Sequence, residues 1–251
     1  MHPTNDLVPI LKKLRLSGVL QSLELRSKQA VGDDLTHLEF LYRLLCDEVE
    51  RREAKQLDLR IRRATFESVT SLEEFDFQFN PLLPKAKILD LATCAFLDRR
   101  ENVALIGPAG IGKSHIAQAL GHRACLAGRS VLYVEARDLF ARLRASRADA
   151  TYERRLKTIT APDLLIIDDL GLTPLRDDEP VDLYEIIRRR YERSSTIVTS
   201  NRDIDEWYPL FGDQLLASAA LDRFLHHAHV IVAPKGRSHR NPQPDVRGDK
   251  P

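Results

Sequence analysis

Residues 107–114 read Gly-Pro-Ala-Gly-Ile-Gly-Lys-Ser, a segment with three glycines that ends in a lysine and a serine. Glycines let consecutive backbone N–H groups point into one concave turn, which binds anions. Lys113 adds a positive charge for the β- and γ-phosphates of a nucleoside triphosphate, and the Ser114 hydroxyl can bind Mg²⁺. The alternative is an ordinary glycine-rich turn. The candidate phosphate-binding residues are Gly107, Pro108, Ala109, Gly110, Ile111, Gly112, Lys113, Ser114 and His115.

The residues on either side of this loop favour the phosphate site. Residues 103–106 are a short apolar run typical of a buried parallel strand, and residues 113–127 have helical apolar spacing before Gly128. A strand, a glycine-rich loop and a helix in this order direct the free N–H groups and the positive dipole end of the helix toward a bound phosphate.

A second candidate feature is the apolar run 164–167, which leads directly into Asp168 and Asp169. A carboxylate at the carboxyl end of a parallel strand can hold the Mg²⁺ of a bound triphosphate, and we assign this role to Asp168. Asp169 is then placed to orient or deprotonate the attacking water. The alternative is a strand that ends in a polar turn.

A third candidate feature is the apolar run 196–199, which is followed by the polar residues Ser200 and Asn201. A side chain at this strand end lies beside the γ-phosphate, so Asn201 could hydrogen-bond the attacking water, although asparagine is also common in turns. No asparagine of the chain is followed by lysine, so the Asn-Lys-x-Asp run that accompanies guanine binding is missing. Its absence favours ATP as the nucleotide.

The composition is typical of a globular protein, with 43% hydrophobic and 30% charged residues over 251 positions. The net charge of +1 does not indicate a nucleic-acid-binding protein, so such a surface would depend on local clusters. Cys46, Cys94 and Cys125 are widely spaced, as reduced core thiols are. We find no signal peptide and no apolar run long enough to span a membrane, and therefore expect a cytoplasmic protein that does not associate with membranes.

The apolar pattern predicts four segments. Residues 1–67 have helical spacing with a break near Ser17 and Gly18, and predict a small all-α domain for a partner or for oligomerisation. Residues 68–84 contain three phenylalanines and two prolines, and predict a linker whose aromatic side chains pack against another part of the chain. Residues 85–235 predict an α/β domain, and residues 236–251 a mobile tail.

Apolar runs and helical segments alternate in the α/β domain. The runs are 103–106, 131–134, 164–167, 196–199 and 230–233, and the helices are expected around 85–99, 113–127, 137–145, 151–159, 178–193 and 213–227. This alternation predicts a parallel sheet with helices on both faces. Ligands of such sheets bind at the carboxyl ends of the strands, which is where the glycine-rich loop begins.

These motifs, in this order, resemble the AAA+ ATPases, and the Asp-Asp strand end is similar to that of the initiator and helicase-loader branch, which includes DnaA and DnaC. Other stretches resemble the IstB-like proteins, the ATPase helpers of insertion-sequence transposases, over nearly the whole chain. They are Leu-Arg-Leu-Ser-Gly (14–18), Ser-Leu-Glu-Leu-Arg (22–26), Glu-Arg-Arg (50–52), Ile-Ile-Asp-Asp-Leu-Gly-Leu (166–172), Arg-Arg-Tyr-Glu-Arg (189–193) and Leu-Asp-Arg-Phe-Leu-His-His-Ala-His-Val-Ile (221–231).

The resemblance implies an α/β fold: a five-stranded parallel-sheet P-loop AAA+ core, with two helices inserted between its second and third strands and without a full C-terminal lid. It implies that Asn201 is at the sensor-1 position and Arg240 at the basic sensor-2 position. It also implies that Arg223 is an arginine finger that reaches the γ-phosphate held by a neighbouring subunit, so that ATP bridges a homo-oligomer. A surface arginine or a local ion pair is the alternative for Arg223.

The expected insertion is basic, with seven basic and three acidic residues between positions 137 and 157. If the arginines among these basic residues line the inner surface of an assembly, they could contact the phosphates of duplex DNA. Charge alone favours a solvated helix face, whereas the resemblance favours DNA. The basic stretch 51–63 is a second candidate for DNA or for a transposase. The DNA-binding candidates are Arg142, Arg144, Arg147, Arg154 and Arg155.

The sequence thus predicts an ATPase that uses ATP and Mg²⁺, assembles on duplex DNA and assists a transposase in DNA transposition. A replicative-helicase loader with the same ATPase core is the alternative, and its partner would be a helicase instead of a transposase. A metabolic kinase is a third interpretation. It would act as a monomer without DNA, and neither the basic insertion nor the helical N-terminal segment supports it.

Overall fold

The computed structural model describes residues 3–68 and 70–233. The chain divides into two compact units, one that ends at Leu59 and one that begins at Arg60. The division lies inside the helix α3 (His37–Ala64), before the boundary at residue 67 that the helical pattern predicts. From Arg60 on, the chain contacts the second unit, since the Arg60 guanidinium donates a hydrogen bond to the Cys125 carbonyl oxygen at 3.4 Å. The predicted tail 236–251 lies outside the described residues.

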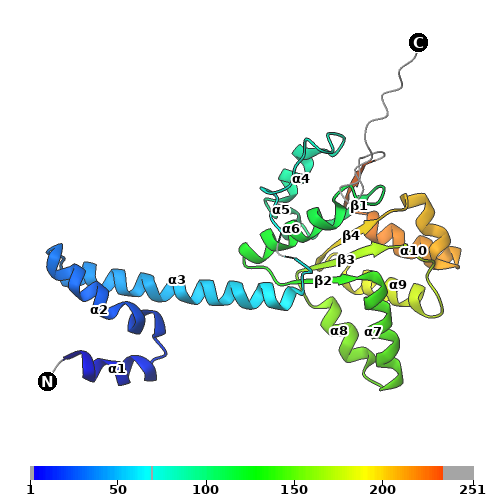
Figure 1. The fold of residues 1–251 in the computed structure, drawn as a ribbon. Helices are drawn as coiled ribbons and strands as arrows, with labels where there is room; N and C mark the ends of the chain where they lie inside the picture. The colour runs from blue at the N-terminus through cyan, green and yellow to red at the C-terminus, as the bar shows by residue number, and fades with distance from the viewer. Residues whose placement is uncertain (1–2, 69, 234–251) are drawn as a thin grey trace, which may run out of the picture. The chain divides into compact units, whose positions relative to one another are not determined.

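The first unit consists of α1 (Pro3–Lys13), α2 (Ser17–Gly32) and the first part of α3 (Figure 1). The predicted break near Ser17 and Gly18 is confirmed. At the start of α2, the N–H groups of Gly18 and Val19 donate to the Glu48 carboxylate at 2.5 and 3.3 Å. A Cβ on Gly18 would lie 2.7 Å from the Glu48 Cα, so this glycine allows α2 to approach α3 closely. The small core of the unit contains Leu11, Val19, Leu23 and Leu44.

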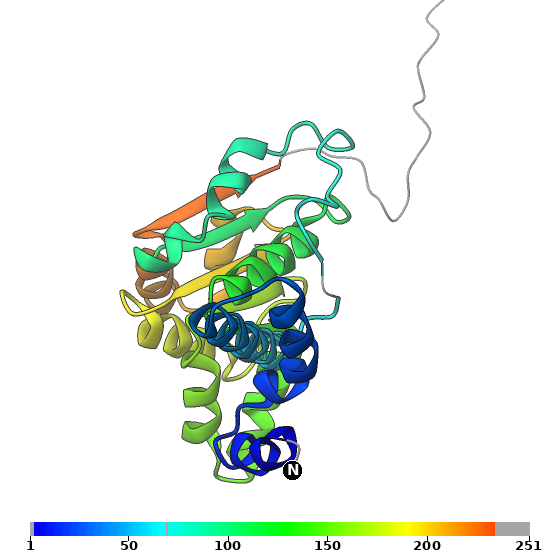
Figure 2. The same cartoon turned by 90° about the vertical axis from the view of Figure 1, so that its left-hand side faces the viewer.

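The second unit is built on five parallel strands, as predicted. They are β1 (Asn102–Ile106), β2 (Val131–Glu135), β3 (Leu164–Leu170), β4 (Ser195–Ser200) and β5 (Ala228–Val232). Their order across the sheet is β2-β3-β4-β1-β5, and all neighbouring strands are parallel (Figure 1). Figure 2 shows β5, in orange-red, beside β1 at one edge of the sheet. The carboxyl ends of β1, β3 and β4 therefore lie side by side.

The helices of this unit follow the predicted alternation. They are α4 (Lys85–Leu91), α5 (Ala95–Asp98), α6 (Lys113–Leu126), α7 (Ala136–Ala148), α8 (Tyr152–Thr160), α9 (Glu179–Arg190) and α10 (Gln214–Leu225). The predicted pair of helices between the second and third strands is confirmed as α7 and α8.

Two details of the helices differ from the prediction. The helix expected at 85–99 is two short ones, because Cys94, directly before the second, has a left-handed φ of 63° that a continuous helix cannot contain. An additional 3₁₀ helix, η1 (Ile204–Phe211), follows β4. Its apolar residues do not form one of the runs that predict a strand, and Pro209 makes the segment a poor candidate for a regular helix.

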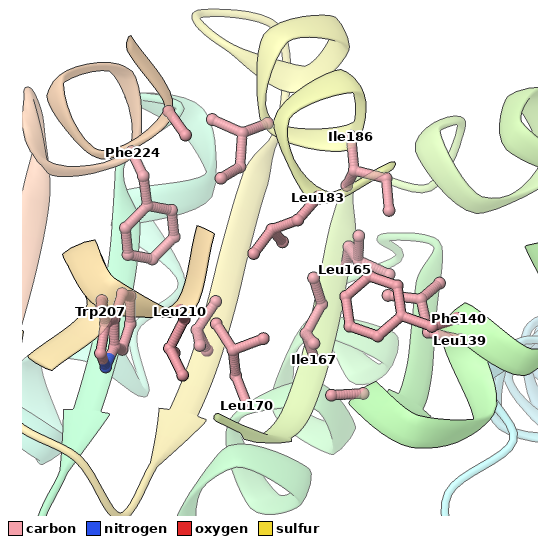
Figure 3. Packing of buried hydrophobic residues seen from close by; sticks show 14 of the residues in the cluster. Leu139, Phe140, Leu165, Ile167, Leu170, Leu183, Ile186, Trp207, Leu210 and Phe224 are labelled. Carbon is pink, nitrogen blue, oxygen red and sulfur yellow. The ribbon is translucent and has the colours of Figure 1, made fainter. Parts of the chain in front are cut away.

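One face of the sheet carries the main core. Side chains of β3, such as Leu165 and Ile167, point into it, and alternate residues point to the other face. The helices α7, α9 and α10 and the 3₁₀ helix η1 cover this face (Figure 3). The residues labelled in Figure 3 are Leu139, Phe140, Leu165, Ile167, Leu170, Leu183, Ile186, Trp207, Leu210 and Phe224.

The opposite face is covered by α6, the helix that follows the glycine-rich loop. Gly121 allows α6 to approach the sheet closely, since a Cβ there would come within 2.8 Å of Ile166 of β3 and of the Phe66 ring. This close packing fixes α6, and with it the loop, against the sheet. Within the described part of the chain, no helix is both long enough and apolar enough to cross a membrane.

Candidate functional site

A cavity of about 420 Å³ opens at the carboxyl ends of β1, β3 and β4. The glycine-rich loop forms one wall, and strand ends that are distant in sequence form the other. Predicted site residues from the loop, from the end of β3 and from the end of β4 meet here. The residues that line the cavity are Glu74, Phe75, Asp76, Ala109, Gly110, Gly112, Lys113, Ser114, His115, Asp169, Leu172 and Asn201.

The loop reaches α6 through Gly112, which has a φ of 98°. A Cβ at this position would lie 2.5 Å from Cε2 of Phe75, so neither the backbone conformation nor the space accepts a side chain. Lys113 and Ser114 follow in the first turn of α6, where the N–H groups at a helix start are available to an anion. The predicted strand, loop and helix arrangement is confirmed.

Lys113 lies at the centre of the site and is only 6% exposed. Its Nζ donates hydrogen bonds to the carbonyl oxygens of Gly107 at 2.8 Å and Pro108 at 2.9 Å, and to Oδ1 of Asn201 at 2.6 Å. Three oxygens thus accept hydrogen bonds from one ammonium group. Oxygens of a bound phosphate could take the place of one or more of them. The bond to Asn201 also joins the loop to the end of β4.

The two acidic residues at the end of β3 have different environments. Asp169 lines the cavity and has a left-handed φ of 55°, at a point where the pairing of β3 with β4 shifts between Ile167 and Leu170. Such a bulge turns a side chain out of the regular alternation. Asp169 is therefore directed to the same cavity as Lys113 and Ser114.

Asp168 lies behind this wall and is 3% exposed. Its carboxylate accepts hydrogen bonds from the Tyr133 hydroxyl at 2.7 Å and from the Thr199 hydroxyl. Burial and the hydrogen bond to Asp168 raise the pKa of Tyr133 well above its usual range, so the phenol remains a donor at neutral pH. The sequence predicts that Asp168 holds Mg²⁺, and in the structure its carboxylate lies behind the residues that line the cavity.

The donors at the site nevertheless fit a magnesium ion. The Ser114 hydroxyl and the Asp169 carboxylate line one cavity, and Asp168 lies next to Asp169 in the chain. Hydroxyl and carboxylate oxygens are the hard ligands that Mg²⁺ prefers, and it commonly keeps several water molecules besides. The Ser114 hydroxyl is thus available to hold the ion directly, and the carboxylates of Asp169 and of the more deeply placed Asp168 are available to its water molecules.

The linker forms the outer wall of the cavity. The Phe75 ring packs on the His115 ring at a centroid distance of 5.2 Å and on Phe77 at 4.8 Å. Nε2 of His115 also lies 3.2 Å from the Ser71 carbonyl oxygen. The predicted packing of the linker aromatics is confirmed for Phe75, which meets the start of α6, whereas Phe77 packs on Phe75 within the linker. Glu74, Phe75, Asp76 and Leu172 are lining residues that sequence reasoning missed, and the phenylalanine pattern of the linker was the available signal.

Arg223 does not line the cavity of its own chain. It lies near the end of α10, where its guanidinium donates to the Ala219 carbonyl oxygen at 2.6 Å and lies 5.7 Å from the centre of the Tyr184 ring. Arg240, assigned above to the sensor-2 position, lies outside the described residues.

The basic insertion divides into bound and exposed arginines. Arg147 donates two hydrogen bonds to the buried Asp182 of α9 at 2.6 and 2.9 Å, and Arg144 forms an ion pair with Glu179. Both arginines therefore tie α7 to α9. Within residues 3–68 and 70–233, three exposed arginines of the insertion form no salt bridge: Arg142, Arg154 and Arg155.

We expect Arg147→Met to destabilise the protein by about 3 kcal/mol, because it leaves a buried carboxylate without its charged partner. Asp182 has a side-chain exposure of 1% and would keep only the neutral Tyr152 hydroxyl at 2.7 Å. Chemical denaturation measures the effect. The matched control is Arg142→Met on the same helix, which should change the free energy of unfolding by less than about 0.5 kcal/mol. Equal stability of the two variants would contradict a structural role for Arg147.

Comparisons with known proteins find similar sequences over most of the chain. The family model of IstB-like ATP-binding proteins matches residues 9–245. A Mycobacterium tuberculosis protein, named for ATP binding and for its place in an insertion sequence, is 40% identical over 235 residues, which cover 92% of this chain and 94% of the relative. A Pseudomonas aeruginosa protein, named for ATP binding and for insertion sequence IS21, is 36% identical over 236 residues and covers 94% of this chain and 89% of its own.

Solved structures show the fold class. DnaA from Aquifex aeolicus, bound to AMPPCP, superposes with a TM-score of 0.54 at 23% identity and covers 66% of this chain and 51% of its own. The DnaC helicase loader superposes with a TM-score of 0.53 at 20% identity, with coverage of 69% of this chain and 98% of its own. The α/β unit thus has the AAA+ fold that it shares with DnaA and the DnaC helicase loader.

Proposed function

The chain belongs to the IstB-like ATP-binding proteins of insertion sequences, and we propose that it hydrolyses ATP, assembles on duplex DNA and assists a transposase in DNA transposition. One observation carries this proposal. A single cavity collects a phosphate-binding loop, the cation of Lys113, the carboxylate of Asp169 and the amide of Asn201.

In the proposed reaction, Lys113 and the N–H groups at the start of α6 hold the phosphates and offset their negative charge. When bound, Mg²⁺ supplies further positive charge to the phosphate oxygens. Asp169 orients the attacking water and accepts its proton. Asn201 lies 2.6 Å from Lys113 and is positioned to hydrogen-bond the same water or the γ-phosphate.

We further propose that Arg223 acts on the ATP of a neighbouring subunit in a homo-oligomer. Support comes from its absence from the lining of its own cavity and from its position near the end of α10, where its guanidinium contacts a backbone oxygen and an aromatic ring and forms no salt bridge with the described residues. A guanidinium supplied from a neighbour stabilises charge on the transferred phosphoryl group and makes turnover depend on assembly.

The proposed DNA surface consists of Arg142, Arg154 and Arg155 on α7 and α8. Arg144 and Arg147, both candidates from the sequence, are already occupied by carboxylates of α9. The exposed arginines can bind phosphates without breaking an internal ion pair. Binding of this kind is largely independent of base sequence.

A helicase loader is the second candidate, favoured by the superposition with DnaC over 98% of that protein. The two functions differ in the partner. Co-purification of the full chain with a transposase, but not with a replicative helicase, is expected for the proposed function. The reverse result would favour the loader.

The proposal as a whole is tested by measuring ATP turnover and sedimentation of the full-length protein with and without duplex DNA. We expect DNA to raise the turnover rate and ATP to favour a larger assembly on DNA. The proposal would be overturned if DNA did not change the rate of ATP turnover and ATP did not change the size of the assembly.

The arginine surface has its own test. We expect R154Q/R155Q to weaken binding to duplexes of any sequence and to lower the slope of log K against log salt concentration by about one for each phosphate that these arginines neutralise. The control R176Q/R193Q removes the same charge from two other exposed arginines of the α/β unit and should keep the wild-type slope. Equal slopes for the two double variants would contradict the assignment.

A further inference from the structure

The end of β3 departs from a regular strand at the two acidic residues. Its pairing with β4 is shifted between Ile167 and Leu170, and Asp169 has a φ of 55°. A residue other than glycine rarely adopts this conformation, so interactions around it must stabilise it.

Side chains from the end of β4 supply those interactions. The Thr199 hydroxyl accepts a hydrogen bond from the Asp169 N–H at 2.9 Å and donates one to the Asp168 carboxylate. The Ser200 hydroxyl donates to the Leu170 carbonyl oxygen at 2.7 Å. The Arg202 side chain donates to the Gly171 carbonyl oxygen at 2.5 Å. Each residue from Asp168 to Gly171 is therefore bound by a side chain of the neighbouring strand end.

Thr199 is the residue that acts on both acids. Its single hydroxyl uses its proton to hold the Asp168 carboxylate inside the protein and its lone pair to hold the peptide of Asp169. The side chain is 0% exposed, so the hydroxyl does not compete with bulk solvent for these two partners. Its branched Cβ restricts rotation about χ1, which keeps the hydroxyl between the two acids.

The same strand end also binds the phosphate-binding loop. Two residues after Thr199, Asn201 accepts a hydrogen bond from Lys113 Nζ at 2.6 Å. The segment 199–201 thus fixes the acids of β3 on one side and the lysine of the loop on the other. This arrangement sets the position of the Asp169 carboxylate relative to Lys113 across the cavity.

We propose that Thr199 is a positioning residue for ATP hydrolysis, which holds Asp168 inward and directs Asp169 into the nucleotide cavity through one hydroxyl. This inference rests on the proposed ATPase function. Asp169 would carry out the proton transfer, and Thr199 would act through Asp169 without touching the nucleotide. Loss of the hydroxyl should therefore affect the rate of turnover more than the binding of ATP.

The test compares Thr199→Val, Thr199→Ala and Thr199→Ser in the full-length protein. Valine and alanine remove the hydroxyl, whereas serine retains it. Thr196→Val is the matched control, because Thr196 is buried in the same strand and accepts a hydrogen bond from Arg190 at 3.0 Å at the opposite end of β4. Steady-state turnover, affinity for a fluorescent ATP analogue and melting temperature are measured for each.

We expect kcat to fall about a hundredfold in T199V and T199A, since a displacement of about 1 Å in a reacting group has an effect of this size. Affinity for the ATP analogue should stay close to that of the wild type in both. T199S should restore kcat, and T196V should keep it although it also removes a buried hydrogen bond. If T199V does not fold, the comparison of kcat between T199A and T199S shows whether the hydroxyl is required.

Two results would overturn the role of Thr199. One is a T199V or T199A protein that turns over as fast as T196V, and the other is a T199S protein as slow as T199A, which would assign the effect to the methyl group. The failure of the proposed function is distinct, because the wild-type protein itself would then not hydrolyse ATP.

Discussion

The K113A variant is expected to bind ATP about 10²- to 10⁴-fold more weakly than the wild type. Lys113 is the cation of the phosphate-binding loop, and its ammonium group replaces neutral acceptors with phosphate oxygens when ATP binds. Two charge-assisted hydrogen bonds, each of about 1.5–3 kcal/mol, account for the expected range. Titration of a fluorescent ATP analogue into the full-length protein measures the decrease in affinity directly.

The structure defines the control that this variant needs. Lys113 also bonds to Gly107, Pro108 and Asn201, so its removal could loosen the loop as well as remove a charge. A melting temperature measured without nucleotide separates the two effects. Lys157→Ala, on the exposed surface of α8, removes the same charge away from the cavity and should bind ATP normally. Wild-type affinity in K113A would contradict the central role of the loop.

The fold could be predicted from the sequence because its signals are local. Each buried strand of a parallel sheet is a short apolar run, and runs such as 103–106 and 164–167 stand out between helical segments. The glycine-rich loop is local as well, since its geometry depends on eight consecutive residues. The carboxyl-edge position of the site then follows from general rules for parallel sheets.

The features that could not be predicted depend on interactions between distant residues. The packing of Phe75 against the start of α6 brings the linker into the cavity wall, and no local pattern identifies its partner. The burial of Asp168 depends on hydroxyls from two other strands, those of Tyr133 and Thr199. The sequence shows two adjacent acids, but it does not show which of them faces the ligand.

Charge counts have the same limitation. Five arginines of the insertion are equivalent candidates in the sequence, yet the guanidinium of Arg147 is bound to a buried carboxylate of α9. The partner, Asp182, lies on α9, and the strand β3 separates this helix from the insertion in the sequence. A local excess of positive charge therefore overstates the number of arginines available to a nucleic acid, and the structure reduces the candidates to those without an internal salt bridge.

The second large effect is expected for Asp169→Asn, which should lower kcat about 10²- to 10⁴-fold while ATP binding is retained. Asparagine has nearly the same shape as aspartate but cannot accept the proton of the attacking water. It is also one of the few residues other than glycine that tolerate a positive φ, so the bulge at the end of β3 should persist. The Asp169 N–H can keep its hydrogen bond to Thr199.

Retained binding combined with slow hydrolysis should hold the protein in its ATP-bound form, so assemblies on duplex DNA should last longer than those of the wild type. Single-turnover hydrolysis and the lifetime of the DNA complex measure the two effects. Asp177→Asn is the matched control, because Asp177 also has a left-handed φ, 51°, but is exposed and does not line the cavity. If D169N and D177N hydrolyse ATP equally fast, the proton acceptor is not Asp169. Asp168 is then the remaining acid at this strand end, and it could reach the nucleotide only by leaving Tyr133 and Thr199.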